Sequence, residues 1–94
     1  MKKSIVASSG NVFIDLGYSK DEAAILQMRA DLMADIRKFI KTKKLTQAEA
    51  AKIFGVSQSR VSDLITSKWE KFSLEMLIIL LTKAGMHVKL EIAA

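Results

Sequence analysis

The sequence predicts a mainly α-helical domain of about four helices with a C-terminal β-strand. Helix-start signals at Thr46 and Ser57 stand on either side of Gly55, which indicates two short helices joined by a tight turn. A long run over about residues 20–42 carries apolar side chains three and four positions apart. Residues 86–92 alternate apolar and polar side chains, which is the period of a half-buried strand.

Composition limits the classes of function. A chain of 94 residues is long enough for one small domain, and half of its residues are hydrophobic, so we expect it to fold. The net charge of +5 favours an anionic partner. The chain has no cysteine and a single histidine, His87, so we expect no disulfide, no metal site and no cofactor. Without an evident nucleophile or paired carboxylates, we do not expect an enzyme.

The two short helices are defined by local signals. Thr46 and Glu49 have the spacing of a capping box, in which each side chain satisfies a backbone donor of the first turn. Gly55 ends this helix, because glycine tolerates the left-handed conformation that a sharp exit needs. Ser57 is then a good N-cap for a second helix over 58 to about 66.

The second short helix has two different faces. Val61, Leu64 and Ile65 are spaced to share one face, which we expect to point into the core. The opposite face and its flanks carry mostly short polar side chains: Ser59, Arg60, Ser62, Asp63, Thr66 and Ser67. A helix that enters a DNA groove needs side chains that reach base edges without bulk.

The stretch 46–65 resembles the helix-turn-helix of the lambda-repressor-like (Xre/Cro) family. The matching positions are Gln47, Ala51, Gly55, Val56, Ser57, Val61 and Leu64. Over about residues 11–92 the chain is similar to one subclass, the HigA-type antitoxins, through its NVFIDLG opening, long helix, FSLEMLIILL helix and MHVKLEI ending. The resemblance implies a lambda-repressor-like fold and a homodimeric, sequence-specific repressor. It would repress its own operon and neutralise a small ribonuclease toxin.

The DNA-binding hypothesis assigns a role to each polar residue of the motif. Gln47 would hold a phosphate, Gln58 and Ser59 would contact base edges, and Arg60 would bind guanine or a phosphate. The Asp63 carboxylate would accept a hydrogen bond from cytosine or form an ion pair with Arg60. Thr66, Ser67 and Lys68 would contact the DNA backbone. The complete predicted DNA-binding set is Gln47, Ser57, Gln58, Ser59, Arg60, Ser62, Asp63, Thr66, Ser67 and Lys68.

Basic residues crowd on either side of the motif. Those before it are Arg37, Lys38, Lys41, Lys43 and Lys44, and those after it are Arg60, Lys68 and Lys71. Such side chains would flank a duplex and contact phosphates, or they would simply be solvated at helix ends.

The remaining segments are expected to support the motif. Residues 1–18 form an N-terminal arm, in which 11–16 is a strand or an apolar segment laid over the core, and 19–94 form the DNA-binding domain. Trp69 is expected to pack between helices. Ser73 caps a last helix that runs towards Gly85 and is apolar on nearly all sides, which predicts a central core helix.

The predicted C-terminal strand needs a partner, because its backbone groups require a ladder. That partner is the same strand of a second subunit, the 11–16 arm, or a strand of another protein. Antiparallel pairing with the same strand of a second subunit is favoured, since a helix-turn-helix dimer can bind two half-sites about 34 Å apart. The predicted dimerisation residues are Met86, Val88, Leu90 and Ile92.

Two other function classes stay open at this stage. One is a stand-alone regulator of the same family without a toxin, and the other is a protein-interaction module that uses the helix-turn-helix only as a scaffold. The apolar run 76–81 is far shorter than the roughly 20 residues of a membrane span, and residues 5–7 are too few for a signal peptide. We therefore expect a cytoplasmic protein without a membrane partner.

Overall fold

The computed structural model describes residues 11–93, which contain five α-helices and one short 3-10 helix, η1. In chain order the elements are α1 (Val12–Asp15), α2 (Lys20–Thr42), α3 (Gln47–Phe54), α4 (Gln58–Ile65), η1 (Trp69–Lys71) and α5 (Leu74–Lys83). The mainly helical prediction is confirmed, with one helix more than expected. The first part of the predicted arm, residues 1–10, lies outside the described residues.

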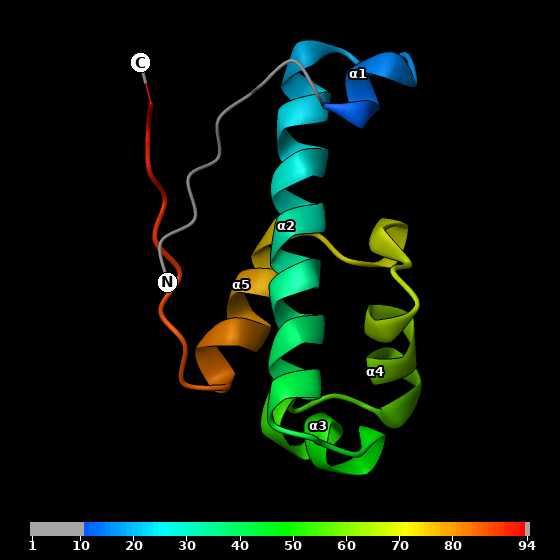
Figure 1. The fold of residues 1–94 in the computed structure, drawn as a ribbon, viewed down its shortest axis with the longest axis vertical. Helices are drawn as coiled ribbons and strands as arrows, with labels where there is room; N and C mark the ends of the chain where they lie inside the picture. Colours follow the sequence, from blue (N-terminus) through cyan, green and yellow to red (C-terminus); the bar gives the residue numbers. More distant parts are fainter. Residues whose placement is uncertain (1–10, 94) are drawn as a thin grey trace.

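Helix α2 is the spine of the molecule. It begins where predicted, at the Ser19 cap, whose hydroxyl accepts the backbone N–H of Glu22 at 3.2 Å. Figure 1 shows α1 beside its first turns, α3 and α4 at its other end, and α5 against its side. The helix-turn-helix pair therefore lies at the opposite end of α2 from α1.

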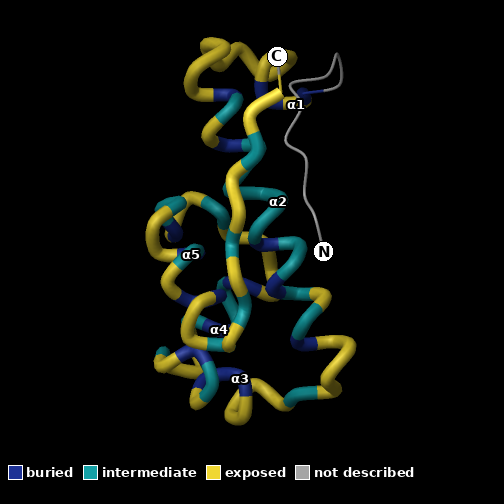
Figure 2. The backbone as a smooth tube through the Cα atoms, turned by 90° about the vertical axis from the view of Figure 1, so that its left-hand side faces the viewer, coloured by how far each residue is buried: buried dark blue, intermediate teal, exposed yellow. Residues whose placement is uncertain are grey.

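The main core forms where α2, α3, α4 and α5 meet. Phe54, Leu64 and Leu77 are fully buried there, and Phe39 packs edge-on against Phe54 with ring centroids 6.0 Å apart. The other buried members are Met33, Ile36, Ile40, Ala50, Ala51, Val61, Phe72, Leu80 and Leu81. Each helix contributes one apolar face, and Figure 2 shows these buried positions alternating with exposed ones along the chain.

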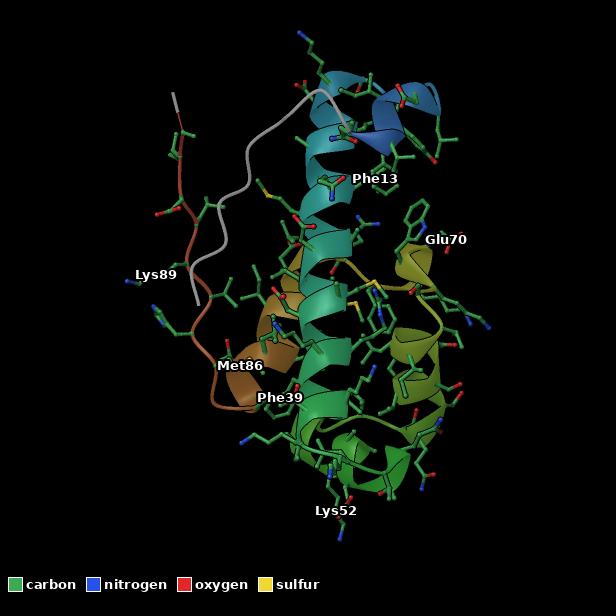
Figure 3. The ribbon with its side chains drawn as sticks, in the orientation of Figure 1. Phe13, Phe39, Lys52, Glu70, Met86 and Lys89 are labelled. Atoms are coloured by element: carbon green, nitrogen blue, oxygen red, sulfur yellow. The ribbon has the colours of Figure 1, made fainter. Side chains whose placement is uncertain are left out.

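Of the two alternatives for 11–16, a strand or an apolar segment over the core, the strand is wrong, because Val12–Asp15 form the short helix α1. Asn11 caps it: its side-chain oxygen accepts the N–H of Phe13 at 2.9 Å, and its amide donates to the carbonyl of Ala23 at 3.1 Å. Phe13 is buried edge-on against Tyr18 and Trp69 (Figure 3). The other large apolar residues of this segment, Val12, Ile14 and Leu16, are exposed. The expected packing of Trp69 is confirmed.

Two predicted burial patterns need correction. Ile65 is 39% exposed rather than in the core, because Val61 and Leu64 already fill the face of α4 that meets the other helices. Helix α5 buries Leu77, Leu80 and Leu81, but Ile79 on its other side is 53% exposed. Helix α5 therefore lies at the side of the core and not at its centre.

The predicted C-terminal strand is not seen in the part of the chain that the structure describes. After α5, residues 86–93 run as extended chain, and within the described residues 11–93 no ladder forms. Met86 and Val88 are half-buried against the core, whereas Leu90 is 68% and Ile92 is 92% exposed. Alternation determines which side chains share a face, but a strand also needs a second backbone to bond with.

Candidate nucleic-acid interface

Helix α3 starts with the predicted capping box. The backbone N–H of Thr46 donates to the Glu49 carboxylate at 2.8 Å, and the N–H of Glu49 donates to the Thr46 hydroxyl at 3.1 Å. Among residues 11–93, no protein group accepts from the N–H groups of Gln47 and Ala48. The side chain of Gln47 is exposed beside them. Free donors at a helix start are a ready site for a phosphate oxygen.

The turn between the two helices is built on Gly55. Its φ of 69° is left-handed, and the next N–H, that of Val56, donates to the Ala51 carbonyl at 3.0 Å. Ala50 and Ala51 are buried where α3 meets α4. Small side chains at this contact let two short helices cross closely.

Helix α4 presents its N-terminal end to solvent. Ser57 caps it by accepting the N–H of Arg60 at 3.1 Å. Ser57, Gln58 and Ser59 are all exposed around this end, whereas Ser62 lies half-buried farther along. The first turn of α4 is therefore free to approach a groove, as the predicted role of Gln58 and Ser59 requires.

Arg60 is held against η1. Its guanidinium stacks over the Phe72 ring, 5.2 Å from the centroid, and Nη1 donates to the Lys71 carbonyl at 3.4 Å. Stacking of this kind fixes a flexible side chain in one orientation. Sequence spacing did not predict it, because Phe72 is twelve positions away and meets Arg60 only in the folded chain.

Asp63 does not pair with Arg60, so that part of the prediction is wrong. Its carboxylate lies 3.8 Å from the Lys68 amine and 3.6 Å from the Lys71 amine. The chain turns back after α4 and brings both lysines to the same carboxylate. These pairs reduce the repulsion between Asp63 and an approaching phosphate.

The chain leaves α4 through a strained residue. The Thr66 hydroxyl donates to the Ser62 carbonyl at 2.8 Å, and Ser67 has a left-handed φ of 59°. Lys68 then donates its N–H to the Asp63 carbonyl at 3.0 Å, which closes the helix end. Lys44, with a φ of 53°, ends α2 in the same way. Neither turn was predicted, because glycine usually marks such a position and here a serine and a lysine occupy it.

A basic surface adjoins α4. Ile65 lines a hollow of about 490 Å³ together with residues from the end of α2. The other lining residues are Arg37, Lys38, Ile40, Lys41, Lys44 and Leu45. Four cations of the predicted basic cluster therefore gather beside the second helix of the motif, whereas Lys43 lines a different groove.

A family comparison agrees with this geometry. A protein-family model described as a helix-turn-helix domain matches residues 12–93, from α1 to the end of the described chain. No curated protein matches the chain. None of the helices between residues 11 and 93 combines the length and apolar character that crossing a bilayer requires. Because the match covers most of the sequence, the chain belongs to this family of helix-turn-helix domains.

Proposed function

We propose that this protein is a sequence-specific DNA-binding repressor whose α4 enters the major groove. The observation that carries the proposal is the exposed polar first turn of α4, on a helix whose last residue, Ile65, adjoins the cations gathered at the end of α2. Short polar side chains contact base edges, and cations contact phosphates. Helix-turn-helix domains are typically DNA-binding and non-enzymatic, which supports the same conclusion.

Each predicted DNA-binding residue has a role in this proposal. Gln47 and the free N–H groups at the start of α3 hold one phosphate, while Gln58 and Ser59 contact bases. Ser57 and Ser62 line the surface of α4 that approaches the groove, and Thr66, Ser67 and Lys68 contact the DNA backbone. Arg60 acts beside η1, so we assign it to phosphate rather than to guanine.

The test is fluorescence anisotropy with DNA from just upstream of the gene and with a scrambled duplex. We expect the upstream DNA to bind about a thousandfold or more tightly. Gln58→Ala, a change at an exposed position, should weaken binding to the upstream DNA by roughly 1–3 kcal/mol and leave the scrambled duplex unaffected. Equal weak binding to both duplexes would favour the protein-interaction module instead.

We further propose that the repressor is the antitoxin of a type II toxin–antitoxin pair and represses its own operon. The support is the resemblance of its opening, helices and C-terminal end to HigA-type antitoxins. The partner would be a small basic ribonuclease encoded beside this gene.

Expression of that neighbouring protein should arrest growth, and co-expression of this chain should restore it. If growth is arrested equally with and without this chain, the antitoxin assignment is wrong and a stand-alone regulator remains. We also propose that the protein acts as a homodimer on two half-sites.

A further inference from the structure

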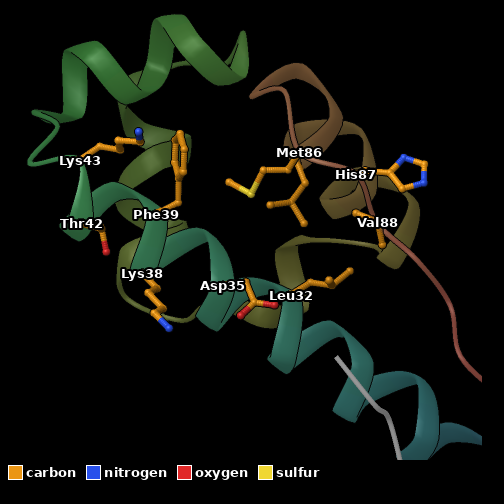
Figure 4. A pocket seen from close by; sticks show the side chains of 10 residues that line it. Leu32, Asp35, Lys38, Phe39, Thr42, Lys43, Met86, His87 and Val88 are labelled. Atoms are coloured by element: carbon orange, nitrogen blue, oxygen red, sulfur yellow. The ribbon is translucent and has the colours of Figure 1, made fainter. Parts of the chain in front are cut away.

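A groove of about 460 Å³ lies between α2, the end of α5 and the C-terminal segment, residues 86–93. Most of its walls are apolar, and the apolar side chains that line it are Leu32, Phe39, Leu81, Met86 and Val88. Figure 4 shows Met86 directed towards Phe39 across the groove, while His87 points away from it. A concave, mostly apolar site of this volume falls within the roughly 300–1,000 Å³ that small-molecule sites occupy.

Charged side chains lie at the two ends of this groove. The Lys43 side chain extends towards the Phe39 ring at one end, and the Asp35 carboxylate lies near Leu32 at the other (Figure 4). Lys43 follows the last residue of α2 and stands eight positions after Asp35, so the two ends are roughly 12 Å apart along the helix axis. A third charged residue, Lys38, also lines the groove. Cations therefore outnumber acids around it.

The two ends differ in the charge that they offer to a ligand. Among residues 11–93, no carboxylate lies within ion-pair distance of the Lys43 amine. Asp35 already makes an interaction of its own. The Lys43 end therefore attracts an anionic group more strongly than the Asp35 end attracts a cation. A second anionic group at the far end would meet the like charge of Asp35.

We propose that this groove binds a small apolar monocarboxylate, an alkyl or aryl acid whose carboxylate pairs with Lys43. The body of the ligand fills the space between Phe39, Met86 and Val88, where its apolar surface leaves water. Phe39 also packs against Phe54 of α3, with ring centroids 6.0 Å apart. None of the predicted DNA-binding residues lines the groove. The site therefore adjoins the helix-turn-helix without overlapping its polar face.

Methyl NMR of methionine tests the site directly. The chain has five methionines, of which Met86 lines the groove, whereas Met76 on α5 lies outside it and is 37% exposed. Decanoate or 4-phenylbutyrate, each added below its micelle concentration, should shift the Met86 methyl resonance saturably and leave that of Met76 unchanged. We expect a dissociation constant of about 1 mM or tighter, which is typical of a ligand of about twelve non-hydrogen atoms. The absence of a saturable Met86 shift with both probes would overturn the proposal.

The head group is tested with probes of the same chain length. Decanol lacks the charge and should bind about fivefold more weakly than decanoate, because an exposed ion pair contributes little more than this. Decylamine should bind more weakly still. Decanedioate should bind about tenfold more weakly than decanoate, since its second carboxylate is taken out of water beside Asp35. If decylamine bound as tightly as decanoate, the assignment of a carboxylate to this groove would be wrong.

Lys43→Met tests the pairing residue. It keeps the length of the apolar stem but removes the amine, so it should weaken decanoate about fivefold and leave decanol unchanged. Lys41→Met is the matched control, because it removes the same charge from the same end of α2 but lines the other hollow, beside Ile65. It should leave decanoate binding unchanged. Equal losses for the two variants would mean that only net charge attracts the ligand, which contradicts a site at Lys43.

Other occupants of the groove would give different results. If a second copy of the chain fills it, the apparent affinity for decanoate should fall as the protein concentration rises. If residues 1–10 fill it, replacing both Ile5 and Val6 with aspartate should raise that affinity. Either result would overturn the proposal, which predicts no change in both cases. All of these measurements are made without DNA, so a failure of the proposed DNA binding would leave their outcome unaffected.

Discussion

Replacing Lys41 with alanine tests whether the basic end of α2 contacts DNA phosphates. Lys41 is exposed in the last turn of α2 and lines the hollow beside Ile65 of α4. If it neutralises a phosphate, its loss abolishes the release of one counterion per chain. The slope of log affinity against log salt should then become shallower by about 0.9 per chain, or about 1.8 for a dimer.

This slope change corresponds to a measurable difference in affinity. Between about 0.05 and 0.2 M salt, the concentration rises fourfold. A slope smaller by about 1.8 therefore makes the loss of dimer affinity over this range roughly twelvefold smaller than in the wild type. Anisotropy titrations at four salt concentrations resolve such a change. The scrambled duplex should show the same slope change, because phosphates carry no sequence information.

Lys20→Ala is the matched control. It removes the same charge from the same helix at an exposed position, but at the opposite end, roughly 30 Å from Lys41. Its slope should equal that of the wild type. Equal slope changes for the two variants would mean that only net charge matters, and an unchanged slope for Lys41→Ala would refute the proposed phosphate contact.

Three further predictions concern the motif itself. Phe54→Ala, at a fully buried position, should reduce the free energy of unfolding by about 3–5 kcal/mol in urea titrations, whereas Ile65→Ala on the exposed side of α4 should cost about 1 kcal/mol or less; similar losses would contradict the observed burial. Thr46→Ala should cost about 1 kcal/mol in thermal unfolding and Thr46→Ser should not, because serine also caps; equal melting of both variants would exclude the capping box. Asp63→Asn releases two lysines and should tighten binding to any duplex at low salt, with a change in stability of about 1 kcal/mol or less. Weaker binding to the upstream DNA alone would instead mean that Asp63 contacts a base.

The helix-turn-helix could be predicted from sequence because its determinants are local. Thr46 and Glu49 bond within one helical turn, Gly55 takes the left-handed conformation, and Ser57 caps the next helix. Each of these effects operates over three or four residues and needs no knowledge of the rest of the chain. The same holds for α2, whose predicted range matches the observed one.

The side-chain environment of the candidate site depends on the folded chain and could not be predicted. Arg60 is restrained by Phe72, and Asp63 by Lys71, across turns whose path has no sequence signature. Ser67 occupies a left-handed position where glycine is the usual signal. The burial of Phe13 in α1 could not be predicted for the same reason, since it depends on Trp69 from a distant segment.

The failed prediction of a C-terminal strand has a different cause, because residues 11–93 contain no second strand for it to pair with. The alternation in 86–92 places the apolar side chains on one face of the segment and the polar ones on the other. Met86 and Val88 pack their part of the apolar face against the core. Leu90 and Ile92 have no such contact within residues 11–93, so their exposed apolar area adds little to the stability of the single chain. If a second copy covers them, the same contact also determines the distance between the two α4 helices, and so the spacing of half-sites that the dimer binds. The residues that look least well packed in one chain would then be those that determine which DNA the pair recognises.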